Sequence, residues 1–307
     1  SIFLFLGYVI FSFFSGFNEF LFAEILLGIG GSLISGADSA ILYDTLLEIK
    51  EEDEYTKIEG RTYAIGNFSE GIAGVLGGFL AMTSINMPVY IQTIVMFLSI
   101  PIAMTLVEPK SSYKLAKSFS SIITVVKDTF IYQRKLRWYI VYSSSMGIAT
   151  LSIAWFVQPF LMEIDTPIIY YGIIWAFLNF TAGITSYYSH FFNNNNLLIY
   201  ISLIMITSLI LLGFNISYYG LIFIILIYLL RGVITPKLRN LININSTSER
   251  RATVLSLRSF VIRISFAVIA PILGYISDSS DLSLVFYVLA FIVGFSSLLA
   301  AFKLKNN

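Results

Sequence analysis

Three carboxylates and two guanidinium groups stand inside long apolar stretches of this 307-residue chain. Glu24, Asp38 and Glu70 lie in its first third, whereas Arg231 and Arg263 lie in its last third. A charged side chain at the centre of a bilayer costs at least about 2.5–3.5 kcal/mol on insertion scales, so such residues persist where they face a cavity or a partner. These five residues are therefore candidates for reversible proton binding and for contact with a solute.

The first two acidic candidates share one helical stripe, which comprises Glu24, Gly28, Gly31, Ser35 and Asp38. Its members step by four, three, four and three residues, a spacing that keeps side chains on one face of a helix. The two carboxyls would lie about 21 Å apart along the helix axis, one in each half of the membrane. Small residues on such a stripe also serve close helix packing, and the glycines fit that alternative.

Glu70 shares a predicted helix face with Tyr63 and Asn67. It lies about 13 Å from the start of its apolar stretch, and therefore near the membrane mid-plane. A carboxyl in apolar surroundings takes up a proton more readily than it does in water, which suits reversible protonation. The alternative is a structural ion pair with an arginine.

Arg231 occurs about 12 residues into its apolar stretch and shares a face with Tyr228 and Thr235. Arg263 lies about 18 Å into its own stretch, which is also near mid-depth. Arg258 points about 140° away from Arg263 around the helix, and it is shallow enough to extend toward water. We therefore rank Arg258 below the other two arginines.

The arginines have two equally weighted interpretations, contact with a solute or a structural partnership with Glu70 or Asp38. The deep acidic residues lie in the N-terminal part of the chain and the deep basic residues in the C-terminal part. A cleft between the two parts would then have one acidic and one basic wall. That suits an anionic or zwitterionic solute, and it equally suits an ion pair between the two parts that forms and breaks.

Composition identifies the solvent that surrounds these residues. The chain is 57% hydrophobic and 12% charged, with a mean hydropathy of +0.83, whereas soluble domains are about 25% charged. Such a chain needs lipid as the solvent for much of its surface. A net charge of +1 gives no basis for nucleic-acid binding, and the lack of cysteine excludes disulfides and thiolate metal sites. Because the chain opens with Ser1 inside an apolar run, we expect it to be a fragment.

Ten apolar stretches are long enough for transmembrane helices, which need about 20 residues each. We predict spans at 1–16, 18–43, 62–83, 88–107, 138–161, 168–192, 197–214, 218–241, 252–277 and 282–302. Among the connectors between these spans, Lys and Arg occur only in alternate ones, and the C-terminal tail carries Lys303 and Lys305. By the positive-inside rule these basic connectors are cytoplasmic, so both ends of the chain are predicted to lie in the cytoplasm.

The segment 108–137 is the one long polar connector. Within it, apolar residues recur at helical spacing: Phe119, Ile122, Ile123, Val126 and Phe130. The pattern predicts an amphipathic helix along the cytoplasmic membrane face. A helix packed against the underside of the bundle is an equal alternative.

This arrangement of helices, together with the glycines Gly28, Gly30 and Gly31 of the second span, resembles the major facilitator superfamily. Glu24 stands at the position where that family usually has an arginine, and the sequence Ala37–Asp44 resembles a bacterial branch of permeases. The resemblance implies an all-α, multi-pass bundle in which ten of twelve helices are present. Its parts would be a partial N-terminal bundle (1–107), a cytoplasmic amphipathic linker (108–137) and a six-helix C-terminal bundle (138–307).

The resemblance also implies a cytoplasmic gate, at which Asp44, Arg61 and Glu48 are candidates for pairing. The sequence has no GxSxG, Walker or HExxH motif, so we expect neither an enzyme nor a cofactor.

We expect a monomeric secondary transporter in the cell membrane that moves a small anionic, zwitterionic or drug-like solute by alternating access, coupled to protons. The proton-coupling candidates are Glu70, Asp38 and Glu24, and the solute-contact candidates are Arg231, Arg263, Tyr228 and Asn67. The alternative is a non-transporting sensor or assembly partner on a transporter fold, in which the internal charges are structural. An enzyme acting on lipids is disfavoured because no acid/base set is present.

Overall fold

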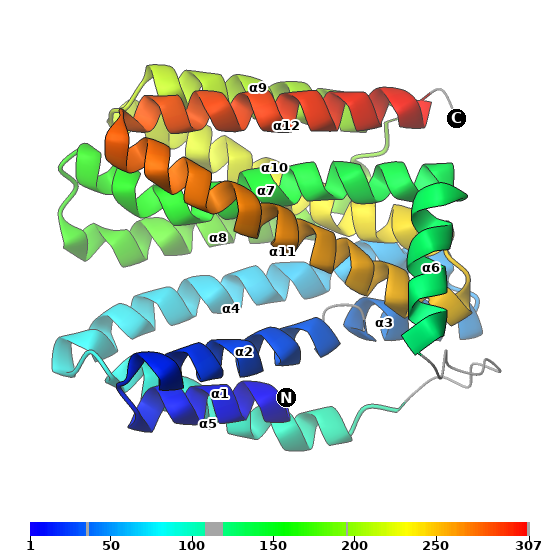
Figure 1. Cartoon of the computed structure of the whole chain (residues 1–307), viewed down its shortest axis with the longest axis horizontal. Helices are drawn as coiled ribbons and strands as arrows, with labels where there is room; N and C mark the ends of the chain where they lie inside the picture. The colour runs from blue at the N-terminus through cyan, green and yellow to red at the C-terminus, as the bar shows by residue number, and fades with distance from the viewer. Residues whose placement is uncertain (35–36, 108–118, 195, 306–307) are drawn as a thin grey trace.

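The structure is a computed structural model in which the described part of the chain is entirely helical and turn (Figure 1). It describes all residues except 35–36, 108–118, 195 and 306–307. The α-helices are α1 (Ile2–Phe13), α2 (Phe17–Ile34), α3 (Ala37–Glu48), α4 (Tyr55–Thr83), α5 (Met87–Met104), α6 (Phe119–Ile131), α7 (Arg134–Glu163), α8 (Tyr171–Tyr187), α9 (Leu197–Phe214), α10 (Leu221–Ile244), α11 (Ser248–Ser279) and α12 (Leu282–Lys305). Short 3₁₀ turns lie at Glu52–Glu54, Ile168–Tyr170, Ser189–Phe191 and Tyr218–Gly220.

Membrane-spanning length and composition are met by eight helices in the described part of the chain. A helix satisfies its own backbone hydrogen bonds, which is why apolar stretches of this length fold as helices in lipid. Nine of the ten predicted spans each fall on one α-helix. The second, 18–43, falls on two helices, α2 and α3, and Ser35 of the predicted stripe lies outside the described residues. The continuous stripe from Glu24 to Asp38 therefore stays a prediction.

The helices form two layers in Figure 1. We call α1–α5 the N-terminal half and α7–α12 the C-terminal half. The end of the molecule that carries α6 and the C-terminus, at the right of Figure 1, also carries the basic connectors, and we call it the basic end. The opposite end, with connectors that lack Lys and Arg, is the neutral end.

Most of the buried core lies within the C-terminal half. Its main cluster joins α7, α8, α9, α10, α11 and α12 through fully buried side chains such as Phe160, Met205, Leu209, Tyr228 and Phe286. By contrast, no residue of α5 is buried, and many large apolar side chains of α1, α2 and α5 face outward. Outward apolar side chains are expected where lipid is the solvent.

Helices α4 and α8 form the closest contact between the two halves. A Cβ at Gly60 would overlap the carbonyl oxygen of Ser186, and one at Gly172 would lie 3.4 Å from the carbonyl oxygen of Gly74. The Ser186 hydroxyl also donates a 2.9 Å hydrogen bond to the Gly60 carbonyl. Small residues thus bring the two backbones together near both ends of α8.

Helix α6 lies crosswise at the basic end (Figure 1) and packs against α7 and α11. Val125 is buried in a cluster with side chains of α3, α7, α10 and α11. Of the predicted stripe, Val126 and Phe130 pack against this cluster, whereas Ile123 is exposed. The structure therefore favours packing against the underside of the bundle, with the contact face centred about one residue away from the predicted one.

Candidate functional site

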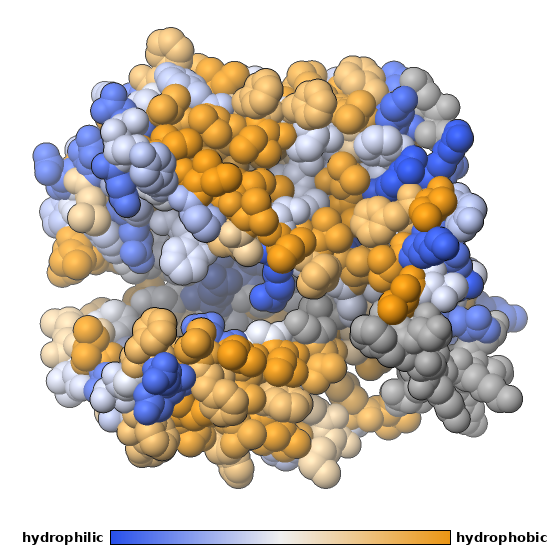
Figure 2. Space-filling model, viewed as in Figure 1, coloured by the Kyte–Doolittle hydropathy of each residue, from blue (hydrophilic) through white to orange (hydrophobic). Residues whose placement is uncertain are grey.

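A cavity of about 680 Å³ lies between the two halves, and we call it the cleft. Its walls come from α4 in the N-terminal half and from α7, α8, α10 and α11 in the C-terminal half. Figure 2 shows a hollow between the halves, with hydrophilic surface inside a largely hydrophobic face, and the hollow opens at the left, toward the neutral end. The charged residues that line the cleft are Glu70, Arg231, Arg239, Arg258 and Arg263.

Glu70 is the acidic residue of the cleft wall, contributed by α4. It is exposed to the cleft rather than enclosed by apolar side chains. No ion pair joins Glu70 to a Lys or Arg within the described residues. The structural ion pair that the sequence left open for Glu70 is therefore not observed, and the carboxyl is accessible for proton exchange.

Arg231 extends from α10 toward α4. Its Nε donates a 2.9 Å hydrogen bond to the hydroxyl of Tyr63, and its guanidinium lies 5.4 Å from the ring centroid of Tyr228. The Tyr228 ring in turn packs edge-on against Trp175, with ring centroids 6.4 Å apart. Neutral hydroxyl and ring partners thus hold this guanidinium in the cleft wall, and the Tyr63 bond links the two halves.

The two arginines of α11 line the same cavity, contrary to our ranking. Arg263 is exposed in the cleft, with its Nη2 3.7 Å from the position of a Cβ at Gly31 on α2. Arg258 is 9% exposed, lines the cleft and donates a hydrogen bond to the Ser143 hydroxyl of α7. The prediction that Arg258 extends to water away from Arg263 is wrong, because the cleft wraps around α11 and a guanidinium reaches into it from the helix flank.

Four other predicted site residues do not line the cleft. Asn67 is buried and donates a hydrogen bond back to the Tyr63 carbonyl, 2.7 Å away, and Tyr228 is buried behind Arg231. Glu24 is exposed on α2 outside the cleft lining. Asp38 lies at the start of α3, toward the basic end.

A network of ion pairs and hydrogen bonds closes the cleft at the basic end. Arg239 of α10 pairs with Glu59 of α4, which is 2% exposed, and its Nη1 lies 3.8 Å from a carboxylate oxygen of Asp38. The Tyr55 hydroxyl donates a 3.0 Å hydrogen bond to Glu59 and shares another with the Ser39 hydroxyl. Since Arg239 also lines the cleft, this network forms its floor.

A second ion pair joins the halves at the same end. Arg251 of α11, 4% exposed, pairs with Asp44 of α3, and its guanidinium lies 4.2 Å from the ring centroid of Tyr43. The predicted pairing of Asp44 with Arg61 is wrong, because Arg61 instead lies over the Tyr187 ring of α8. We call the pairs Arg239–Glu59, Arg239–Asp38 and Arg251–Asp44 the basic-end seal.

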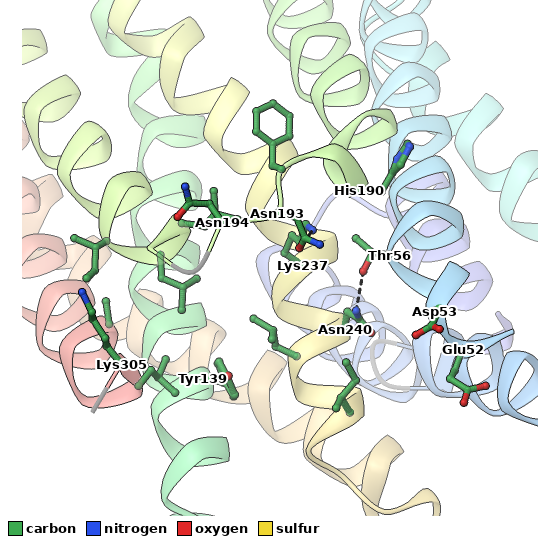
Figure 3. A pocket seen from close by; sticks show the side chains of 18 of the residues that line it. Glu52, Asp53, Thr56, Tyr139, His190, Asn193, Asn194, Lys237, Asn240 and Lys305 are labelled. Atoms are coloured by element: carbon green, nitrogen blue, oxygen red, sulfur yellow. Dashed lines mark hydrogen bonds between the residues drawn. The ribbon is translucent and has the colours of Figure 1, made fainter. Parts of the chain in front are cut away.

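A further cavity of about 700 Å³ lies at the basic end, and Thr56 and Asn240 line it (Figure 3). They are joined by a 2.7 Å hydrogen bond between α4 and α10. Thr56 lies one helical turn before Glu59, and Asn240 directly follows Arg239. Glu52, Asp53 and Lys237 also line this cavity. Within the described residues, no group of three or more His, Asp or Glu side chains is placed to hold a metal ion.

Sequence reasoning missed Glu59 and Arg239, although the helical spacing contained a signal for both. Glu59 lies four residues before Tyr63 on the face that leads to Glu70, and Arg239 lies eight residues after Arg231 on its face. Extending both stripes by one turn toward the basic end would have identified the floor of the cleft.

The geometry defines a multi-pass membrane protein with two helical halves around a charged cleft, and comparison with solved structures gives the fold its name. The chain matches the major facilitator superfamily transporter FucP in an outward conformation, with a TM-score of 0.71 and 15% identity over 98% of this chain and 82% of that one. A variant of the E. coli fucose:proton symporter FucP matches with the same TM-score and coverage at 16% identity. The fold is thus that of major facilitator transporters, as the sequence resemblance predicted. No protein-family model matches the sequence, and no curated protein matches it.

Proposed function

We propose that this protein is a secondary active transporter that moves a small solute across the cell membrane by alternating access, coupled to protons. The observation that carries the proposal is a charged cleft between two halves that is sealed at one end by ion pairs between those halves. A seal built from separable charged groups forms and breaks without unfolding either half. Such a seal is what alternate exposure of one site requires.

Proton coupling rests on Glu70. It is the acidic group of a cleft wall that otherwise carries arginines, and it is exposed there without an ion-pair partner in the described residues. A carboxyl near the membrane mid-plane that faces a wet cleft binds and releases protons as the cleft changes access. A protein of the same fold carries the name fucose:proton symporter, which is consistent with this use of the fold. Asp38, in contact with Arg239, belongs to the seal in this proposal, and Glu24 is assigned no role.

The orientation of the chain follows from its charge distribution. The basic end carries Lys and Arg in its connectors, and the positive-inside rule assigns that end to the cytoplasm. The cleft then faces the exterior, with its cytoplasmic floor closed. Both ends of the chain lie in the cytoplasm in this arrangement, and the protein acts as a monomer.

The test is transport by the purified chain in proteoliposomes. A thermal-shift screen of small solutes at two pH values selects a ligand, and its uptake is then measured with and without an imposed pH gradient. We expect uptake driven by the gradient, and we expect Glu70→Gln to remove the dependence on the gradient while solute binding persists. Glu163→Gln, which changes an exposed carboxyl at the neutral end, is the matched control. Transport by Glu70→Gln with an unchanged response to pH would remove Glu70 from the coupling role.

A further inference from the structure

We infer that the solute of the cleft is a small organic anion with an apolar body, held by Arg231, Arg258 and Arg263. The inference rests on the proposed function, because it names the class of solute for the same cleft. Four arginines line this one cavity. Within the described residues, only Arg239 among them pairs with a carboxylate. The floor of the cleft is therefore neutralised, whereas its remaining cationic wall is not.

The hydrogen-bond and ring partners of the other three arginines are all neutral. Arg231 donates to a tyrosine hydroxyl, and Arg258 donates to the hydroxyl of Ser143. Arg263 is exposed in the cleft and has no hydrogen-bond or ion-pair partner among the described residues. Guanidinium groups stay charged in proteins. The buried charge of Arg258 is costly unless it is paired, and the exposed guanidinium of Arg263 is accessible to an anion. The three guanidinium groups therefore lack a nearby negative charge, which neutral hydroxyl groups do not supply.

Glu70 does not meet that requirement either. It is the acidic residue among those that line the cleft, against three arginines without a carboxylate partner. The cleft therefore keeps a positive balance whether Glu70 is protonated or ionised. A cation would add to that excess, and a neutral solute would leave it in place. A carboxylate or phosphate supplies the missing charge and accepts two parallel hydrogen bonds from one guanidinium.

The rest of the cleft wall defines the body of the solute. Trp155 and Trp175, with Met146, Leu151 and Phe266, line the same cavity as the arginines. Trp155 is 70% exposed, so its ring is available to a ligand. A volume of about 680 Å³ falls in the range of pockets that enclose drug-sized molecules. The geometry favours an anion with an aromatic or branched aliphatic body over a small inorganic ion.

The test is calorimetric binding by the full chain in lipid nanodiscs, without any gradient. The probes are naphthalene-2-carboxylate, its neutral analogue naphthalene-2-carboxamide, and naphthalene-2,6-dicarboxylate. We expect the carboxylate to bind at least about 10-fold more tightly than the amide, since a hydrogen bond to a charged group contributes roughly 10- to 100-fold in affinity. Arg263→Gln should weaken carboxylate binding by about 10-fold, whereas Lys135→Gln, an exposed lysine away from the cleft, should leave it unchanged.

Three outcomes would overturn the inference: equal affinity for the carboxylate and the amide, carboxylate binding that survives Arg231→Gln, Arg258→Gln and Arg263→Gln alike, or no binding of either anion below about 1 mM. Thermal unfolding of each variant establishes that it is folded. Because binding is measured without a gradient, anion binding without uptake would count against transport and leave the anion site standing. Gradient-driven uptake of neutral solutes alone would support transport and count against the anion site.

Discussion

The buried carboxylate of Glu59 offers the sharpest test of the basic-end seal. Glu59→Gln keeps the size and the hydrogen-bonding shape of the side chain while it removes the charge that faces Arg239. We expect the variant to populate the state in which the basic end is open. The reason is that the ion pair joins α4 to α10, and so contributes free energy only while the two halves are in contact at that end.

The magnitude follows from the burial of the pair. Removing one partner of a buried ion pair costs about 3–5 kcal/mol, because the other charge is left uncompensated. Glu59 is 2% exposed, but Asp38, 49% exposed and 3.8 Å from Arg239, retains part of the compensation. We therefore expect about 3 kcal/mol, which lowers the ratio of closed to open molecules by roughly 100-fold.

The assay is a distance measurement between pairs of spin labels in nanodiscs. The chain has no cysteine, so labelling sites can be introduced without removing any native one. Glu51→Cys with Glu249→Cys reports on the basic end, and Ile85→Cys with Ile168→Cys reports on the neutral end; all four positions are exposed. In Glu59→Gln we expect the basic-end distances to lengthen and the neutral-end distances to shorten.

The control is Glu54→Gln, which removes the same charge from an exposed pair, Glu54–Lys57, within α4 and its preceding turn. That pair does not join the two halves, so both distance distributions should match the parent chain. If Glu59→Gln remains folded and also matches the parent at both ends, the ion pair does not bias access, and the reasoning fails. Restoration of the closed state by the exchange Glu59→Arg with Arg239→Glu would support it further.

Other substitutions test the contacts between the halves. Gly60→Ala should lower the stability of the detergent-solubilised protein by about 1–3 kcal/mol, because its Cβ overlaps the α8 backbone. Gly66→Ala, which meets open space on the same helix, should gain about 0.5–1 kcal/mol. Equal effects of the two substitutions in thermal unfolding would contradict the close contact of α4 with α8. Asp44→Asn leaves a buried arginine without its carboxylate. It should shift the equilibrium between the closed and open states by about 2 kcal/mol, and the spin-label distances should change in the same direction as in Glu59→Gln. Unchanged distances would remove this pair from the seal. Thr56→Val breaks the 2.7 Å hydrogen bond to Asn240, and it should shift the same equilibrium by only about 1 kcal/mol. A shift as large as that of Glu59→Gln would indicate that buried contacts, rather than ion pairs, hold the basic end closed.

The fold was largely predictable because lipid imposes a simple rule on the sequence. Each membrane-crossing segment needs a continuous apolar stretch, so 197–214 or 282–302 is recognisable by length alone. The composition of one segment does not show which of its faces contacts the rest of the bundle. The contact face of α6 is therefore centred on Val125, where the bundle lies, and not on the predicted stripe through Ile123.

The site was predictable only in part, for a related reason. Depth in the membrane identified Glu70, Arg231 and Arg263, since charge there demands an explanation. The same criterion of depth ranked Arg258 too low, because its side chain enters the cleft from the flank of α11. It also failed to identify Glu59, which lies before the apolar stretch begins. Partner choice across helices depends on tertiary packing, so the pairing of Asp44 with Arg251 had no signal in the sequence.

The close approach of α4 and α8 has a mechanical consequence. Where a glycine allows one backbone to contact another, no side chains lie between them that could repack during a movement. The two halves therefore cannot separate along this line without losing contacts near both of its ends at once. In the proposed transport cycle, a movement that opens the basic end therefore has to break the Ser186–Gly60 hydrogen bond, and it leaves the Gly172–Gly74 approach as the contact on which the two halves tilt.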